Sequence, residues 1–249
     1  MKRKTFVRNI GICTATVLIA SLSAVYTVFD YMFFGARTTD TSKLGDAKGN
    51  YTIIIDAGHG GFDGGAVGVS GVLEKDINLS IARQLCSLFE LSGYEAVMTR
   101  TDDSLLCDED LQTGKKISDL KNRVKIAEEY DNPLFISIHQ NKFPLEKYKG
   151  LQVWYSKNSD ESGTLAEIIQ NNTITFLQND NNRKVKQAGR NIFVLHKLQC
   201  PAVLVECGFL SNSNEEKLLC DKDYQKKIAF VIFSSVSEFV SENSNKQDI

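Results

Sequence analysis

Two of the three histidines in this chain stand where they could hold a metal ion. His59 lies in a glycine-rich segment after an apolar run, and His139 directly follows another apolar run. Catalytic zinc sites commonly combine two histidines with one glutamate and leave a fourth position for water. Glu74 begins a helical pattern just beyond the glycine-rich segment and is the candidate third ligand. Its alternative role is to compensate the dipole at the start of that helix.

Glu206 is the candidate proton carrier for such a site. It ends the apolar run 202–205, where a charged side chain is costly unless it has a partner or a task. Hydrolysis of an amide requires a group that takes a proton from water and returns it to the leaving nitrogen. The residues therefore favour Glu206 as the catalytic carboxylate, with a buried ion pair as the alternative.

The elements that would position these groups alternate along the chain. Strands are predicted at 51–56, 95–98, 134–138, 150–155, 191–195 and 202–206, and helices at 76–91, 116–130 and 164–177, with two more up to about residue 240. This alternation predicts one α/β domain with a largely parallel sheet. Reactive groups in such sheets lie just past the carboxyl ends of the strands. His59, His139 and Glu206 all occupy that position in the pattern.

The first fifty residues are predicted to lie outside this domain. A basic stretch, 1–8, precedes an uncharged stretch, 9–29, that as a helix is long enough to span one hydrocarbon core. The excess of positive charge before it predicts that the remaining chain lies outside the membrane. A membrane anchor and a cleaved signal segment both remain open, and either makes the domain extracytoplasmic. We expect a linker over 30–50, a catalytic domain over 51–241 and a polar tail over 242–249.

Charge and motif spacing argue against two other classes, the nucleic-acid-binding proteins and the proteins that bind phosphate or a dinucleotide in a glycine-rich loop. The chain has 29 Lys and Arg against 31 Asp and Glu, and this net charge of −2 gives no reason to expect a nucleic-acid partner. Two phosphate-binding loops also fail on spacing: no Gly-Lys-Ser/Thr follows the glycine-rich segment, and Asp63 stands where a dinucleotide fingerprint needs its third glycine.

Four ordered motifs resemble those of the zinc N-acetylmuramoyl-L-alanine amidases of the Amidase_3 type. They are Asp-Ala-Gly-His-Gly-Gly at 56–61, Glu-Lys-Asp-Ile-Asn-Leu at 74–79, Ser-Ile-His-Gln-Asn at 137–141, and the segment 201–212 around Glu206. The resemblance extends over residues 51–240. It implies one Zn²⁺ per chain bound by His59, Glu74 and His139, with Glu206 as the catalytic carboxylate. It also implies a three-layer domain whose mixed, mostly parallel sheet has about six strands.

The resemblance further implies that the substrate is peptidoglycan, cut between the lactyl group of muramic acid and L-alanine. One hydrophobic segment, a short linker and a bare catalytic domain are similar to the germination-specific amidases of spore cortex, which prepare muramic-δ-lactam formation. No long charged helix that could cover the site is visible, so an activating protein would act by another route. Gln140 departs from the family pattern, which usually has a small residue there, and this departure is expected to affect the local groove.

Two further residues are candidates for substrate binding. Asn141 could orient His139 or a substrate carbonyl, or simply form a turn. Arg190 could meet a carboxylate of the stem peptide, or be a solvated loop charge. Two functional alternatives also stay open: a cysteine-dependent wall peptidase that uses Cys207, and a non-catalytic cell-wall binding protein of the same fold.

Overall fold

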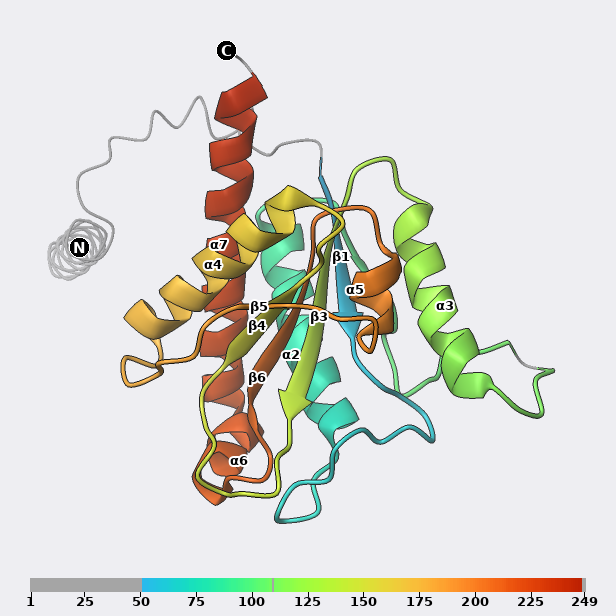
Figure 1. Ribbon diagram of the computed structural model, residues 1–249, viewed down its shortest axis with the longest axis vertical. Helices are drawn as coiled ribbons and strands as arrows, with labels where there is room; N and C mark the ends of the chain where they lie inside the picture. Colours follow the sequence, from blue (N-terminus) through green and yellow to red (C-terminus); the bar gives the residue numbers. More distant parts are fainter. Residues whose placement is uncertain (1–50, 109, 248–249) are drawn as a thin grey trace, which may run out of the picture. The chain divides into compact units, whose positions relative to one another are not determined.

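A single six-stranded sheet forms the centre of the domain (Figure 1). The computed structural model describes residues 51–108 and 110–247, so the predicted membrane or signal segment and the linker lie outside the described residues. The strands are β1 (Thr52–Ala57), β2 (Ala96–Met98), β3 (Pro133–Asn141), β4 (Gln152–Tyr155), β5 (Lys186–Gln187) and β6 (Ala202–Phe209). The helices are α2 (Glu74–Leu91), α3 (Lys115–Glu128), α4 (Asp160–Phe176), α5 (Phe193–Lys197), α6 (Ser213–Cys220) and α7 (Lys222–Gln247).

The strand order β2-β1-β3-β6-β4-β5 makes the sheet mixed and mostly parallel. Strands β2, β1, β3 and β6 run parallel, β4 is antiparallel to β6, and β5 is parallel to β4. Two apolar cores cover its faces. Alternate strand residues such as Ile53 and Ile55 pack on the side of α2, α4 and α7, whereas Ile54 packs on the side of α3 and α5. The three-layer α/β architecture expected from the sequence is thus confirmed.

One predicted strand is wrong. Residues 191–195 were expected to form a strand, but most of this run belongs to the short helix α5, and the sixth strand is the two-residue β5. A short apolar run does not by its periodicity distinguish a strand from a buried helix. Smaller differences concern helix ends: α4 begins at Asp160, ahead of the expected 164, and α7 extends to Gln247, into the segment expected as a polar tail.

Among residues 51–108 and 110–247, no helix is both long and apolar enough to span a membrane.

A buried ionic network holds the segment that follows β1. Asp56 is almost completely buried, and its carboxylate pairs with Nη1 of Arg123 on α3 at 2.5 Å. Hydroxyls of Thr99 and Ser137 donate to the same carboxylate. Although burial opposes ionisation, the Arg123 guanidinium and these hydroxyls keep the pKa of Asp56 below its ordinary value. Arg123 also donates to the carbonyls of Ala57 and His59, so α3 fixes the path of the chain after β1.

We expect Arg123→Met to lower the free energy of unfolding by about 3–5 kcal/mol, because it leaves the buried Asp56 carboxylate without its counter-ion. Urea denaturation measures this change. Arg83→Met is the matched control, since Arg83 is exposed and hydrogen-bonds only the Thr101 carbonyl. A loss below about 1 kcal/mol for Arg123→Met would contradict the prediction.

Candidate active site

The two strand-borne candidates lie side by side on one face of the sheet. His139 of β3 is the register partner of Glu206 on β6, and both point to the face that carries α3 and α5. Helix α5 has only five residues and packs against the middle of this face, around Leu204 and Ala202. The carboxyl ends of β3 and β6 therefore position both side chains at one edge of the sheet.

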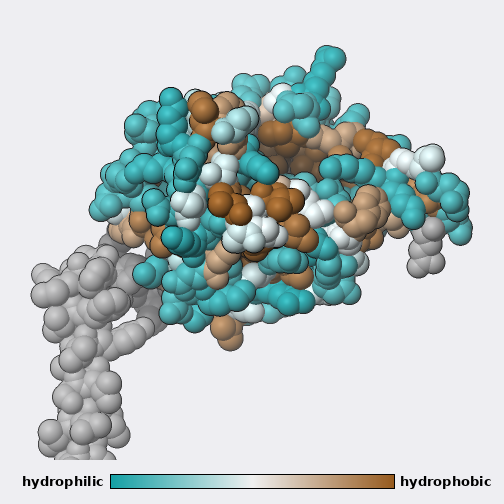
Figure 2. Space-filling view, turned by 90° about the horizontal axis from the view of Figure 1, so that it is seen from below, coloured by the Kyte–Doolittle hydropathy of each residue, from teal (hydrophilic) through white to brown (hydrophobic). Residues whose placement is uncertain are grey.

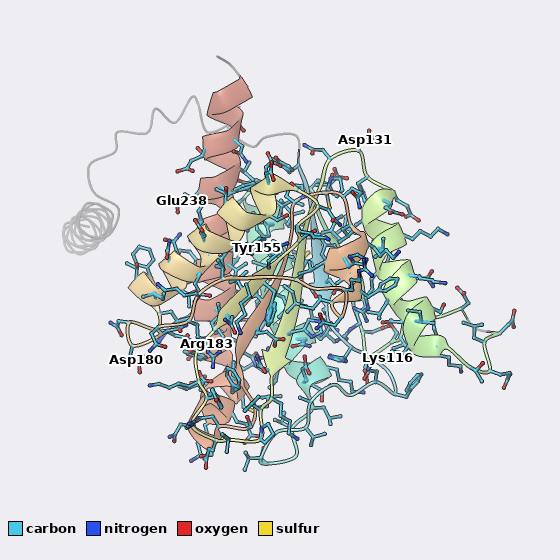
Figure 3. The ribbon with its side chains drawn as sticks, viewed as in Figure 1. Lys116, Asp131, Tyr155, Asp180, Arg183 and Glu238 are labelled. Carbon is cyan, nitrogen blue, oxygen red and sulfur yellow. The ribbon has the colours of Figure 1, made fainter. Side chains whose placement is uncertain are left out.

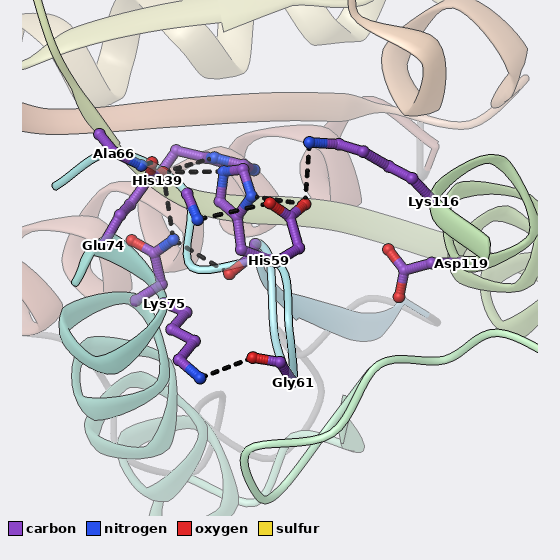
Figure 4. Close-up of polar contacts among 12 residues, drawn as sticks. His59, Gly61, Ala66, Glu74, Lys75, Lys116, Asp119 and His139 are labelled. Atoms are coloured by element: carbon purple, nitrogen blue, oxygen red, sulfur yellow. Dashed lines mark hydrogen bonds and ion pairs between the residues drawn. The ribbon is translucent and has the colours of Figure 1, made fainter. Parts of the chain in front are cut away.

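His59, Glu74 and His139 converge at that edge (Figure 4). His59 comes from the loop after β1 and Glu74 from the first turn of α2. Oε1 of Glu74 lies 2.9 Å from Nδ1 of His139 and 3.3 Å from Nε2 of His59. The donor atoms of all three residues lie within 4.8 Å of one another. The structure thus brings together the three residues that the sequence predicted as metal ligands.

Two glycines make this convergence possible. A Cβ at position 58 would lie 2.2 Å from Nε2 of His139, and one at position 65 would lie 2.6 Å from Oε2 of Glu74. Neither position can therefore carry a side chain while the cluster is intact. His59 itself has a φ of +63°, which is strained for a residue with a Cβ. The hydrogen bond from Arg123 to the His59 carbonyl helps to hold that conformation.

The donor set fits zinc. Two ligand atoms bound tetrahedrally at about 2.0–2.1 Å from zinc are about 3.3 Å apart, close to the two separations measured from Glu74. Although burial alone would favour its neutral form, contacts with His139 and His59 hold the pKa of Glu74 far below its ordinary value. Asp63 Oδ2 lies 3.0 Å from Nδ1 of His59, and an Nδ1–H donated to Asp63 would leave Nε2, which faces Glu74, free to bind a metal.

Glu206 is the unsatisfied group beside this cluster. Its Oε2 is buried and has no hydrogen-bond partner among the described residues. Burial, together with the nearby Glu74 carboxylate, raises the pKa of Glu206 to about 7, while the two histidines act in the opposite direction. No buried ion pair of Glu206 is present in the described part of the chain, so that alternative is not supported. A carboxyl group that titrates near neutrality is suited to accept and return a proton.

Gln140 supports the cluster from the opposite face, and the expectation that it affects the groove was wrong. Its side chain is buried and donates to Oδ1 of Asn78 on α2, at 3.1 Å. Asn78 in turn donates to Oε1 of Glu74, and the backbone N–H of Gln140 donates to the same oxygen at 3.0 Å. The Ala66 amide donates to the other oxygen, Oε2, at 2.7 Å. Glu74 is therefore fixed by three segments of the chain.

The two candidates for substrate binding lie at different places. Asn141 ends β3 two residues after His139, across a register shift in the pairing with β6, and is half-buried. Arg190 lies in the exposed turn between β5 and α5. The structure thus places Asn141 next to the cluster along β3, whereas Arg190 belongs to the surface.

Cys207 does not have the surroundings of a nucleophile. It is completely buried in the core on the α2 and α7 face, the side opposite to Glu206. Burial raises the pKa of its thiol, and its Sγ contacts the Val205 carbonyl and the Gln140 side chain, neither of which is a base that could activate it. A cysteine-dependent mechanism is thus contradicted. All five cysteines of the described residues are free.

Sequence reasoning missed the residues that orient the ligands. Asp63 contacts His59 and is itself paired with Nζ of Lys116, at 3.0 Å (Figure 4). The spacing of four between His59 and Asp63 was a visible signal within the glycine-rich segment. The pairing with Lys116 on α3 depends on tertiary structure and had no signal.

Comparisons with known proteins agree with this geometry. Residues 53–238 match the family model of N-acetylmuramoyl-L-alanine amidase, Amidase_3. The germination-specific N-acetylmuramoyl-L-alanine amidase of Bacillus subtilis is 35% identical over 195 residues, which are 78% of this chain and 81% of that protein. AmiA of Escherichia coli is 27% identical, with 79% of this chain and 78% of that protein covered.

Solved structures give the same result. The CwlD amidase from Clostridioides difficile, solved in complex with the GerS lipoprotein, superposes with a TM-score of 0.73 at 42% identity, covering 76% of this chain and 98% of that one. AmiC2 of Nostoc punctiforme gives a TM-score of 0.66 at 32% identity, covering 77% of this chain and 98% of that one. The chain therefore belongs to the N-acetylmuramoyl-L-alanine amidase family and is an enzyme of that activity.

Proposed function

We propose that this amidase is zinc-dependent and cuts the bond between N-acetylmuramic acid and L-alanine in spore-cortex peptidoglycan, outside the membrane. The observation that carries the proposal is the cluster of His59, Glu74 and His139 beside the unpartnered carboxyl of Glu206. The cortex as the site of action is supported by the similarity to the germination-specific amidase of B. subtilis. A non-catalytic wall-binding role is disfavoured because both the ligand set and the proton carrier are intact.

Each residue has a distinct part in the proposed reaction. His59, Glu74 and His139 would hold the zinc, which when bound polarises an amide carbonyl and makes water more acidic. Glu206 takes the proton of the attacking water and delivers it to the leaving nitrogen of L-alanine. Asn141, two residues beyond His139 at the end of β3, is proposed to orient the substrate. Arg190 stays a prediction for a stem-peptide contact, although its exposed position gives it no further support.

A protein partner is part of the proposal. The C. difficile relative was solved with a lipoprotein bound, and we propose that this chain also works with an activating protein. Figure 2 shows apolar residues gathered among polar ones on the face seen from below. Exposed apolar side chains on the loops near the site include Phe62, Val69 and Leu145.

The direct test is digestion of purified spore-cortex peptidoglycan by the full-length protein, with zinc and with a chelator. New L-alanine amino termini should appear with zinc, disappear with the chelator and return when zinc is restored. Unchanged release in the presence of the chelator would contradict the metal assignment. Release from vegetative wall but not from cortex would contradict the cortex assignment alone.

Asp63→Asn is expected to weaken zinc affinity about 10–100-fold, because the hydrogen-bond acceptor that orients His59 becomes a weaker, neutral group. Competition against a fluorescent zinc chelator measures this change. At saturating zinc the turnover should largely recover. Asp131→Asn, an exposed acid beyond the end of α3, is the control. Equal zinc affinity in the two variants would show that Asp63 does not act on the ligand.

A further inference from the structure

A second polar site lies next to Glu206 on the side of β4, at the same end of the strands as the histidine cluster. A cavity of about 230 Å³ is lined by 147–149, from the loop between β3 and β4, and by 180–183, from the loop between α4 and β5. Figure 3 shows Asp180 and Arg183 on the side of β4 and β5, whereas Lys116 lies on α3, beyond β1. The lining carries three cationic side chains, Lys147, Lys149 and Arg183, against the single carboxylate of Asp180.

The one carboxylate is already engaged. Asp180 is paired with Lys149. Within the part of the chain that the structure describes, neither Lys147 nor Arg183 forms an ion pair. Glu215 is near, but its carboxylate accepts the amide N–H groups of Gly150 and Phe209. Counting Asp180 and the nearby Glu215 against Lys147, Lys149 and Arg183 leaves one net positive charge at the cavity.

Arg183 is fixed in place with one donor group left over. Its guanidinium carbon lies 4.3 Å from the centroid of the Phe209 ring. Nε donates to the Lys149 carbonyl at 2.6 Å and Nη1 to Oε1 of Gln152 at 3.1 Å. Nη2 has no hydrogen-bond partner among the described residues. An arginine held by stacking and two hydrogen bonds loses little conformational freedom when it binds an anion.

A continuous polar row connects this guanidinium to the reaction centre. Gln152 on β4 is the register partner of Glu206, as Glu206 is of His139, so all three share one face. Neighbouring strands are about 4.8 Å apart, which places Gln152 about 10 Å from His139 across the sheet. An extended peptide covers that distance in about three residues.

We propose that Arg183 and Lys147 form a subsite for a free carboxylate of the peptide, two to three residues beyond the scissile amide. This inference rests on the proposed function, since it requires that the amide carbonyl is bound beside His139. The guanidinium pairs with the carboxylate through its free Nη2, and Lys147 adds charge from the neighbouring loop. The subsite selects stem peptides whose carboxylates are free over those in which they are amidated.

The test uses the full-length zinc-loaded protein and two substrates, an N-acetylmuramoyl tetrapeptide with free carboxylates and the same compound with its carboxylates converted to amides. We expect Arg183→Gln to raise KM for the acidic substrate about ten-fold, with kcat within two-fold, and to leave KM for the amidated substrate unchanged. Arg183→Lys should restore part of the loss. Arg83→Gln is the matched control, since Arg83 is exposed on α2 and hydrogen-bonds only the Thr101 carbonyl, and it should match wild type on both substrates.

The outcomes separate the two proposals. If Arg183→Gln leaves KM for the acidic substrate unchanged, or raises KM equally for both substrates, the subsite is wrong while the amidase assignment stands. An effect of Arg190→Gln with none of Arg183→Gln would also overturn it. If wild-type protein cleaves neither substrate, alone or together with a lipoprotein of the kind bound to the C. difficile relative, the proposed function itself fails. Should Arg183→Gln fail to fold, Lys147→Gln decides, because Lys147 makes only a cation–ring contact with Tyr148, and an unchanged KM there overturns the proposal.

Discussion

Glu206→Gln should lower kcat at least about a hundred-fold while leaving zinc content and the folded state unchanged. General acid–base catalysis by a positioned side chain contributes about 10²–10⁴-fold, and an amide of the same shape cannot accept the proton. The folded state should tolerate the change, because the buried Oε2 has no partner to lose among the described residues. Cleavage of a disaccharide tetrapeptide, combined with elemental analysis for zinc, measures both quantities.

Cys207→Ala is the control for this experiment. It changes the adjacent residue, whose side chain points into the opposite core, and should leave kcat within a few-fold of wild type. A variant Glu206→Gln with wild-type turnover would remove the carboxylate from the mechanism. Loss of zinc in that variant would instead make Glu206 a ligand.

The raised pKa of Glu206 also predicts a pH dependence. The residue must be ionised to accept a proton, and burial raises its pKa to about 7 in the metal-free protein. Activity should therefore increase with pH and reach a plateau once Glu206 is ionised. A bound cation favours the ionised form, so in the zinc-loaded enzyme this limb should lie below pH 7. A profile of kcat/KM that declines from pH 5 to 7 would contradict the assignment.

His139→Ala should abolish both zinc binding and activity. Metal ions contribute several kcal/mol of transition-state stabilisation, so we expect a loss of at least about a thousand-fold. Without His139, only His59 and Glu74 of the three clustered residues are left to bind the metal. The change is measured by elemental analysis and by release of L-alanine termini from peptidoglycan.

His196→Ala is the matched control, since His196 on α5 is the only other histidine in the sequence and is not part of the cluster. It should keep full zinc content and activity. Retained zinc in His139→Ala would show that the ligand set is wrong, whereas loss of zinc in both variants would point to a general failure to fold.

The sequence predicted the central part of this structure because local and functional signals coincide there. The β1, β3 and β6 segments are apolar runs that end in polar residues, so both the strands and the candidate residues could be read together. At the edge of the sheet these sequence signals are absent. β5 consists of two exposed polar residues held by backbone pairing to β4, and no side-chain pattern marks it.

The supporting residues could not be predicted because they act across long separations. Arg123 meets Asp56 from 67 positions along the chain, and Gln140 meets Asn78 from 62 positions. The face to which Gln140 points depends on the register of β3, and a shift by one residue would reverse it. Among these supporting contacts, only the one between His59 and Asp63 could be read from the sequence, because the two residues are four positions apart.

The way Glu74 is held makes metal occupancy a determinant of stability. Its two oxygens join the loop after β1, the end of β3 and the start of α2, through Ala66, Gln140 and Asn78. A metal bound only by the folded protein raises its stability by about 2.7 kcal/mol at a free concentration of one hundred times Kd. A metal held at Glu74 would therefore stabilise the folded enzyme in addition to its part in catalysis.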